Sequence, residues 1–264
     1  MFKTRLLSGI LLVAIALVTI ISGGYVLLFT LACVSVIGMQ ELYRAMKVRE
    51  EKFELLELAG YLGAALYYGA VVADFEKYGT MAILLSLVMM MFVYVFTYPK
   101  YNAHQVMAAF FGVVYVAVML SFILLTRNLE GGKYIVWLIF LCSWGCDTCA
   151  YCVGMLIGRH KMAPVLSPKK SVEGAVGGVV GAAVLGAVYA AATGGRPVEY
   201  AVICTVGALI SMVGDLAASA IKRNQEIKDY GKLIPGHGGI LDRFDSVIFT
   251  APVIYYLAKL VLGL

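Results

Sequence analysis

The chain has 264 residues, of which 62% are hydrophobic and 14% are charged, and its formal net charge is +5. A soluble domain carries roughly 45–50% apolar and about 25% charged residues, so a water-soluble globule, a disordered chain and a disulfide-stapled secreted domain are excluded. The composition predicts an all-α, polytopic integral membrane protein in a single membrane domain, residues 1–264, without a separate soluble domain.

Nine apolar segments are long enough to cross a bilayer, which takes about 20 residues for a helix. They are residues 6–22, 23–40, 59–74, 78–98, 105–126, 133–157, 172–192, 197–221 and 244–263. The first segment, with Lys3 and Arg5 before it, also resembles a cleaved secretory signal. Since many further spans follow, we interpret it as a retained helix that forms a hairpin with the second.

The basic residues divide unequally between the two sides that nine spans define. Sixteen of the 21 Lys and Arg residues fall on the side of the N-terminus. The other side holds Lys77, Arg127, Lys133, Arg196 and Lys259. By the positive-inside rule the N-terminus is therefore expected in the cytoplasm. Topology thus accounts for most of the positive charge, and no nucleic-acid partner is expected.

The charged segment 41–58 follows the second span and allows two interpretations. It could be an amphipathic helix on the bilayer surface. It could instead be a solvated loop with an extended helix end, which we favour.

Two acidic residues lie inside predicted spans and more than three residues from either end, Asp147 in 133–157 and Asp215 in 197–221. At about 1.5 Å per residue they would be about 15 Å and about 9 Å from the cytoplasmic ends of their helices. Ionisable groups within a membrane are costly and usually mark a functional site. The alternative is a structural hydrogen bond to a neighbouring helix.

A polar helix face begins at Asp215 and continues through Ser219, Lys222 and Arg223, because residues three or four apart share a face. The loop that follows contains Lys228, Asp229, His237, Gly238 and Gly239, and the last span opens with Asp242, Arg243 and Asp245. Carboxylates at a helix start also suit the positive end of its dipole.

This combination predicts a phosphate-handling site. The carboxylates of Asp215, Asp242 and Asp245 are hard oxygen ligands that suit Mg²⁺. The cations of Lys222, Arg223, Lys228 and Arg243 can neutralise polyphosphate. The Gly238-Gly239 pair allows backbone N–H groups to approach an anion.

A second polar loop joins the spans 133–157 and 172–192. It contains Arg159, His160 and Lys161, followed by Ser167, Pro168, Lys169, Lys170 and Ser171. Positive charge here could be a topology signal alone. The mixture of hydroxyls and paired lysines beside a proline favours a lip that binds nucleotide or phosphate.

Residues 219–245 resemble the signature of the phosphatidate cytidylyltransferases, also called CDP-diacylglycerol synthases. The matching positions are Ser219-x-Ile221-Lys222-Arg223, Lys228-Asp229-x-Gly231 and Ile234-Pro235-x-His237-Gly238-Gly239-Ile240-x-Asp242-Arg243-Phe244-Asp245. The segments Ser167–Ser171 and Trp144–Asp147 resemble the same family.

The resemblance implies transfer of the cytidylyl group of CTP to phosphatidate, with pyrophosphate released. It implies Mg²⁺ dependence, with a second monovalent or divalent cation left open, and a homodimer. Residues 1–130 would then be a scaffold that could carry dimer contacts, and residues 131–264 would be catalytic. The expected location is the inner membrane of a bacterium, with the active site facing the cytoplasm.

The resemblance also implies residue roles. The metal carboxylates would be Asp215, Asp242 and Asp245, with Asp147 in the same cavity, and Lys222 and Arg223 would act in catalysis. The substrate contacts would be Ser219, Lys228, Asp229, His237, Gly238, Gly239, Arg243, Ser167, Lys169, Lys170 and Ser171. A phosphatidate oxygen is already ionised near neutral pH, so no general base is needed, and His237 is expected to fix the loop or bind phosphate.

Two rival functions remain open. An ion-coupled secondary transporter would use Asp147 and Asp215, but it predicts two related halves with discontinuous helices, and the sequence has no such symmetry. A CDP-alcohol phosphotransferase would carry a denser Asp-rich helix. Cys142, Cys146, Cys149 and Cys152 could bind a soft metal, although packing is favoured. The glycines at 174, 177, 178 and 181 are likewise typical of helix packing rather than of a nucleotide loop.

Overall fold

The computed structural model describes residues 2–49, 53–236 and 238–264, and most of them are helical. Among these residues, seven helical segments are long and apolar enough to cross a membrane. They are α2 (Gly24–Ala45), α3 (Leu55–Phe96), α4-η1-α5 (Ala103–Arg127), α6-η2-α7 (Gly132–Ile157), α8 (Val172–Thr193), α9 (Pro197–Asn224) and α10 (Leu241–Leu262). Helix α1 (Phe2–Ser22) contains a shorter apolar stretch, Gly9–Ser22. The predicted class, an all-α polytopic membrane protein, is confirmed.

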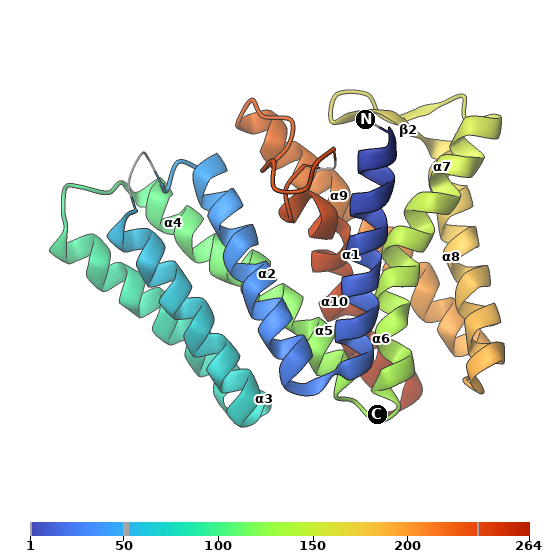
Figure 1. Cartoon of the computed structure of the whole chain (residues 1–264), viewed down its shortest axis with the longest axis horizontal. Helices are drawn as coiled ribbons and strands as arrows, with labels where there is room; N and C mark the ends of the chain where they lie inside the picture. Colours follow the sequence, from blue (N-terminus) through green and yellow to red (C-terminus); the bar gives the residue numbers. More distant parts are fainter. Residues whose placement is uncertain (1, 50–52, 237) are drawn as a thin grey trace. The chain divides into compact units, whose positions relative to one another are not determined.

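Helix α3 is a hairpin of two helices rather than one rod. A straight helix of its 42 residues would be about 63 Å long, twice the roughly 30 Å of a hydrocarbon core. The backbone leaves the helical region at Asp74 (φ −173°, ψ 103°), and the Asp74 carboxylate accepts the N–H of Lys77 at 3.1 Å. The Ser86 hydroxyl donates to the Gly63 carbonyl across the hairpin at 3.3 Å, so the two halves lie side by side (Figure 1). The break falls where the predicted spans 59–74 and 78–98 are separated.

Contacts divide the chain into two compact units. The first consists of Met1–Leu124 and Gln225–Arg243, and the second of Leu125–Asn224 and Phe244–Leu264. The loop after α9 therefore belongs to the first unit, although it lies between two helices of the second in the sequence.

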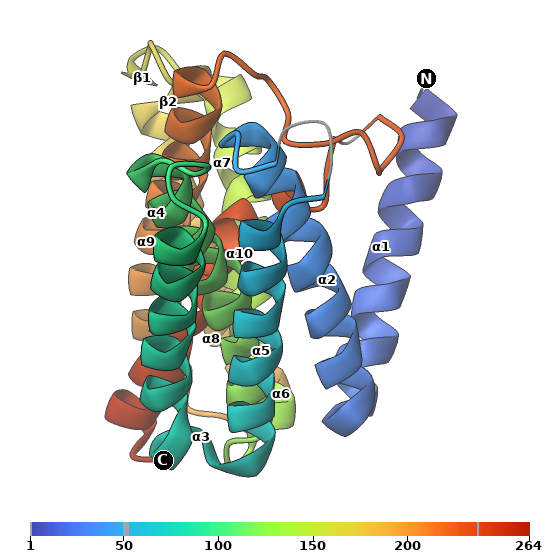
Figure 2. The same cartoon turned by 90° about the vertical axis from the view of Figure 1, so that its left-hand side faces the viewer.

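In the first unit α1 and α2 form the expected antiparallel hairpin (Figure 2), and α2 packs against α3 and η1 (Val113–Val118). Tyr43 is fully buried, and its hydroxyl donates to the Ala109 carbonyl at 2.7 Å. A Cβ at Gly60 or Gly112 would overlap its ring. The favoured helix extension is confirmed for residues 41–45, because α2 continues to Ala45. The expected solvation of segment 41–58 is wrong for Glu41 and Glu57, which are 5% and 0% exposed.

In the second unit, α7 (Cys146–Ile157) and α8 pack closely because glycines of α8 face side chains of α7. A Cβ at Gly177 would overlap Val153, and one at Gly178 or Gly181 would overlap the thiol of Cys146 or Cys149. Small residues allow helices to approach closely in this way. The packing interpretation is therefore confirmed for these glycines and for Cys146 and Cys149, whereas Cys152 is exposed.

Candidate functional site

The polar connection between α7 and α8 is a β-hairpin, which the sequence did not indicate. Strands β1 (Lys161–Ala163) and β2 (Ser167–Ser171) pair antiparallel, with Lys161 opposite Ser171 and Ala163 opposite Ser167. Figure 1 shows β2 at the end of α7 and α8.

The base of this hairpin is fixed by side chains at the start of α8. The Ser171 hydroxyl oxygen accepts the N–H of Gly174 at 3.1 Å and so caps the helix. The Glu173 carboxylate accepts the backbone N–H of Arg159 at 3.0 Å and pairs with His160 Nδ1 at 2.6 Å. Ser171, predicted to bind substrate, thus accepts one structural hydrogen bond, and its hydroxyl proton is not used by this bond.

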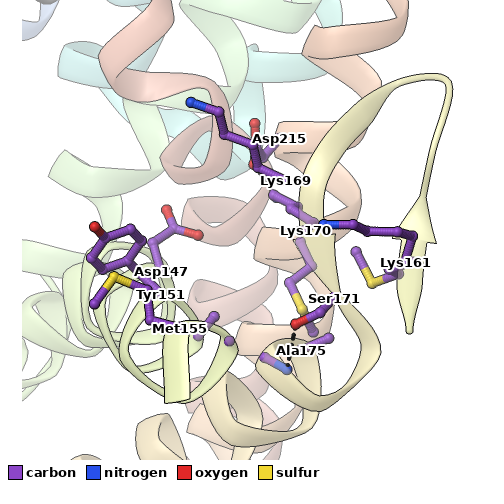
Figure 3. Close-up of a pocket in the computed structure, with 14 residues that line it drawn as sticks. Asp147, Tyr151, Met155, Lys161, Lys169, Lys170, Ser171, Ala175 and Asp215 are labelled. Atoms are coloured by element: carbon purple, nitrogen blue, oxygen red, sulfur yellow. Dashed lines mark hydrogen bonds and ion pairs between the residues drawn. The ribbon is translucent and has the colours of Figure 1, made fainter. Parts of the chain in front are cut away.

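A cavity of about 500 Å³ lies in the second unit between α7, the hairpin, α8 and α9. Its polar lining comprises Asp147, Lys161, Lys169, Lys170, Ser171 and Asp215, and its large apolar lining comprises Tyr151, Met155, Met162 and Met212. Figure 3 shows Asp147, Tyr151 and Met155 on one side, with Lys161, Lys170 and Asp215 on the other. The two acids predicted within separate spans therefore share one pocket.

A π-helical turn sets the direction of Asp147. The segment η2 (Leu141–Gly145) interrupts the helix between α6 (Gly132–Phe140) and α7, and Asp147 follows two residues after it. A π-turn accommodates one extra residue, and such turns are frequent at functional sites. The extra residue rotates all following side chains by about 100° relative to an uninterrupted helix. The pocket position of Asp147 thus depends on η2.

An ion pair joins the hairpin to α9 at the pocket. Lys170 on β2 pairs with the Asp215 carboxylate on α9, and both side chains are 25% exposed. A cation and a carboxylate are therefore both held at the pocket surface and remain accessible to a charged ligand.

The predicted polar face of α9 is present, because the helix is continuous to Asn224. Lys222 is buried, with its Nζ 4.0 Å from Asp245 Oδ2 of α10, whereas Arg223 is exposed. A Cβ at Gly214 would touch the Asp245 carbonyl and Phe249, so the two helices approach closely there. Within the described part of this unit, Ser219, Lys222, Arg223 and Asp245 lie outside the pocket lining.

In the first unit, Asp242 organises the loop that precedes α10. Its Oδ2 accepts the N–H of Tyr230 at 2.8 Å and the N–H of Gly239 at 3.0 Å. Gly238 has φ +88°, in the left-handed region that favours glycine, and a Cβ there would contact this carboxylate. The N–H of Gly239, predicted to approach an anion, is thus bonded within the protein. Lys228 and Asp229 are exposed, and His237 lies outside the described residues.

Sequence reasoning overlooked Glu41, which contacts this loop. Glu41 Oε1 accepts the N–H of Ile240 at 3.1 Å, and Oε2 accepts that of Leu241 at 2.8 Å. Its position one residue after a predicted span is the available signal, although a charged segment beside a span is more typical of a solvated loop.

Three of the four carboxylates predicted to bind Mg²⁺, Asp147, Asp215 and Asp245, belong to the second unit, and Asp242 belongs to the first. Among the described residues, no three His, Cys, Asp or Glu side chains form a group that could hold a metal. Asp147 and Asp215 do share the pocket of the second unit, and Asp242 and Asp245 are three residues apart at the start of α10. A pair of carboxylates completed by substrate phosphates is a usual Mg²⁺ environment, so the pocket's donors fit this ion.

Comparison with known proteins gives concordant similarities over nearly the whole chain. A model of the cytidylyltransferase family matches residues 3–261. The phosphatidate cytidylyltransferase of Bacillus subtilis (strain 168) is 32% identical over 271 aligned positions, covering 98% of each chain. Those of Staphylococcus epidermidis (strain RP62A) and Staphylococcus aureus (strain COL) are 32% and 31% identical, each covering 96% of this chain and 97% of its own.

Proposed function

Because the chain belongs to the cytidylyltransferase family, we propose that it is a phosphatidate cytidylyltransferase. It transfers the cytidylyl group of CTP to phosphatidate and releases pyrophosphate. The observation that carries the proposal is the pocket of the second unit, where two carboxylates and three lysines adjoin an apolar wall. The family match gives the transporter alternative no support.

The two kinds of pocket lining suit the two substrates. Lys161, Lys169 and Lys170 can bind phosphate oxygens. Tyr151 and Met155 are 67% and 68% exposed on α7, and their apolar surface can contact the glycerol and acyl part of a lipid.

The reaction is an in-line displacement at phosphorus. A phosphatidate oxygen forms a bond to the α-phosphorus of CTP, while the bond from that phosphorus to the bridging oxygen breaks and pyrophosphate leaves with the electron pair. Since the attacking oxygen is already anionic, the protein's part is to orient both substrates and to neutralise charge. Lys170 can exchange its Asp215 partner for a phosphate oxygen, because both are anionic oxygens.

A bound Mg²⁺ would supply further neutralisation of phosphate charge. Asp147 and Asp215 are the proposed ligands in the pocket. Roles for Asp242 and Asp245 as additional ligands, a second cation and a homodimer stay predictions from the family resemblance.

We expect the purified protein to form CDP-diacylglycerol and pyrophosphate in equal amounts from CTP and phosphatidate in mixed micelles with Mg²⁺. Product formation is checked by pyrophosphate release and by mass spectrometry of the lipid. Diacylglycerol in place of phosphatidate should give no product, because it lacks the attacking phosphate. Failure of the folded protein to form product from phosphatidate would contradict the proposal.

The proposed topology has nine crossings, because the two halves of α3 and α1 are added to the remaining segments. The N-terminus, the hairpin 161–171 and the loop 225–240 then face the cytoplasm of a bacterial cell, in agreement with the distribution of Lys and Arg.

This topology predicts opposite trypsin sensitivity in vesicles of opposite orientation. Cleavage after Lys161 and Lys232 is expected in inside-out vesicles, and cleavage after Lys133 in right-side-out vesicles, since all three side chains are exposed. Peptide mass spectrometry identifies the sites. Cleavage at Lys161 and Lys133 from the same side of a sealed vesicle would contradict the topology.

A further inference from the structure

We infer that Glu41 is a positioning residue for cytidylyl transfer, an inference that rests on the proposed function. Its carboxylate accepts backbone N–H groups at the end of the loop that follows α9 and at the first turn of α10, where Asp242 lies. Glu41 is on α2, about 200 positions away in the sequence, yet it belongs to the same compact unit as this loop.

The first support is the pairing of both carboxylate oxygens. Oε1 accepts the N–H of Ile240 and Oε2 accepts that of Leu241. The first N–H groups of a helix have no partner within the helix, and a negative charge is favoured at that end. Glu41 therefore caps α10 from another helix, with charge-assisted hydrogen bonds that are stronger than neutral ones.

The second support is the shape of the loop. A Cβ at Gly231 or at Gly239 would overlap the Glu41 carboxylate, so the loop passes Glu41 twice at a distance that only glycine permits. Gly239 also donates its N–H to Asp242. One short segment of backbone is thus held between two carboxylates.

The third support is burial. Glu41 is 5% exposed, and a buried carboxylate is costly unless hydrogen-bond donors surround it. The charged groups that act on it are Arg44, one turn later on α2, and Asp242. The backbone N–H groups of the loop therefore stabilise the Glu41 charge, and the charge in turn stabilises this loop conformation.

The test compares Glu41→Gln with Glu41→Asp. Glutamine keeps the size but replaces one acceptor oxygen by an NH₂ group that cannot accept an N–H. We expect kcat/KM to fall roughly 10- to 100-fold, as for loss of a hydrogen bond to a charged group. Aspartate keeps both acceptors and should recover part of this loss.

A readout without substrate measures the loop itself. Trypsin cleavage after Lys232, in the loop, is compared with cleavage after Lys161, in the hairpin, for the protein in detergent. Glu41→Gln should raise the ratio of the two rates, whereas general unfolding would raise both. The matched control is Glu57→Gln, because Glu57 is fully buried in the same unit and its side chain bonds to Tyr61 and Arg49.

A second pair of variants covers the case in which Glu41→Gln does not fold. Gly239→Ala disturbs the same contact from the loop side and should change the ratio in the same direction. Gly69→Ala on α3 has open space for its methyl group and should leave it unchanged.

Three outcomes would overturn the inference. The first is that Glu41→Gln leaves the ratio of cleavage after Lys232 to cleavage after Lys161 unchanged, and the second is that it raises this ratio but keeps wild-type activity. The third is that Glu57→Gln raises the ratio as much as Glu41→Gln does. The proposed function fails separately, since it requires only that the wild-type protein form product. The ratio of the two trypsin cleavage rates can be measured even if the wild-type protein forms no product.

Discussion

Asp215→Asn is expected to lower the kcat of cytidylyl transfer by at least about 100-fold, a loss typical of removing one preorganised electrostatic contact. The substitution keeps the shape of the side chain and removes its charge. Asp215 is the partner of Lys170 in the pocket and a proposed Mg²⁺ ligand, so both functions are weakened together. The measurement is kcat at saturating CTP, with thermal unfolding to show that the variant is folded.

The control for this variant lies on the same helix. Glu199 is near the opposite end of α9 and pairs with Arg196 at 3.5 Å on the surface, so Glu199→Gln should leave kcat unchanged. Lys170→Met combined with Asp215→Asn tests the coupling: the double variant should lose less activity than the two single losses multiplied. Wild-type kcat in Asp215→Asn would remove this residue from the catalytic set.

Asp242→Asn and Asp242→Ala are both expected to lose cytidylyl-transfer activity, but Asp242→Ala is expected to be the less stable of the two. Asparagine still offers an oxygen to the N–H groups of Tyr230 and Gly239, which the Asp242 carboxylate now accepts. Alanine leaves these donors without that acceptor, so the unfolding free energy should fall by about 1–3 kcal/mol. Both variants lose the charge, and activity should drop at least about 100-fold in each.

Thermal unfolding and steady-state kinetics on the two Asp242 variants separate the effects. Full activity of Asp242→Asn would show that Asp242 serves only to close the loop, and the proposed metal role would then be withdrawn. Equal stability of the two variants would show instead that the hydrogen bonds to Tyr230 and Gly239 contribute little.

The helices were predictable because apolar runs are a local property of the sequence. Even the break in α3 at Asp74 was visible as the gap between two predicted spans. Packing of Gly178 against Cys146 was predictable as well, since small residues at helical spacing indicate close helix contact.

The features that hydropathy missed depend on contacts between distant residues. The strands of the hairpin have three and five residues, and β2 contains Pro168, so neither has a clear strand pattern. The burial of Glu41 is not visible in the sequence, because its hydrogen-bond partners lie about 200 residues later. The capping role of Ser171 is not visible in the sequence, because a helix cap and a phosphate lip favour the same residue type; in the structure Ser171 both caps α8 and lines the pocket.

The π-helical segment η2 makes the pocket depend on the number of residues between Phe140 and Cys146, and not only on their identities. Substitutions that keep this segment apolar preserve the direction of Asp147. Loss of a single residue would turn the carboxylate away and bring a neighbouring side chain to its place. The length of this segment is therefore as important to the pocket as the identity of Asp147, and an insertion would misplace the carboxylate as a deletion does.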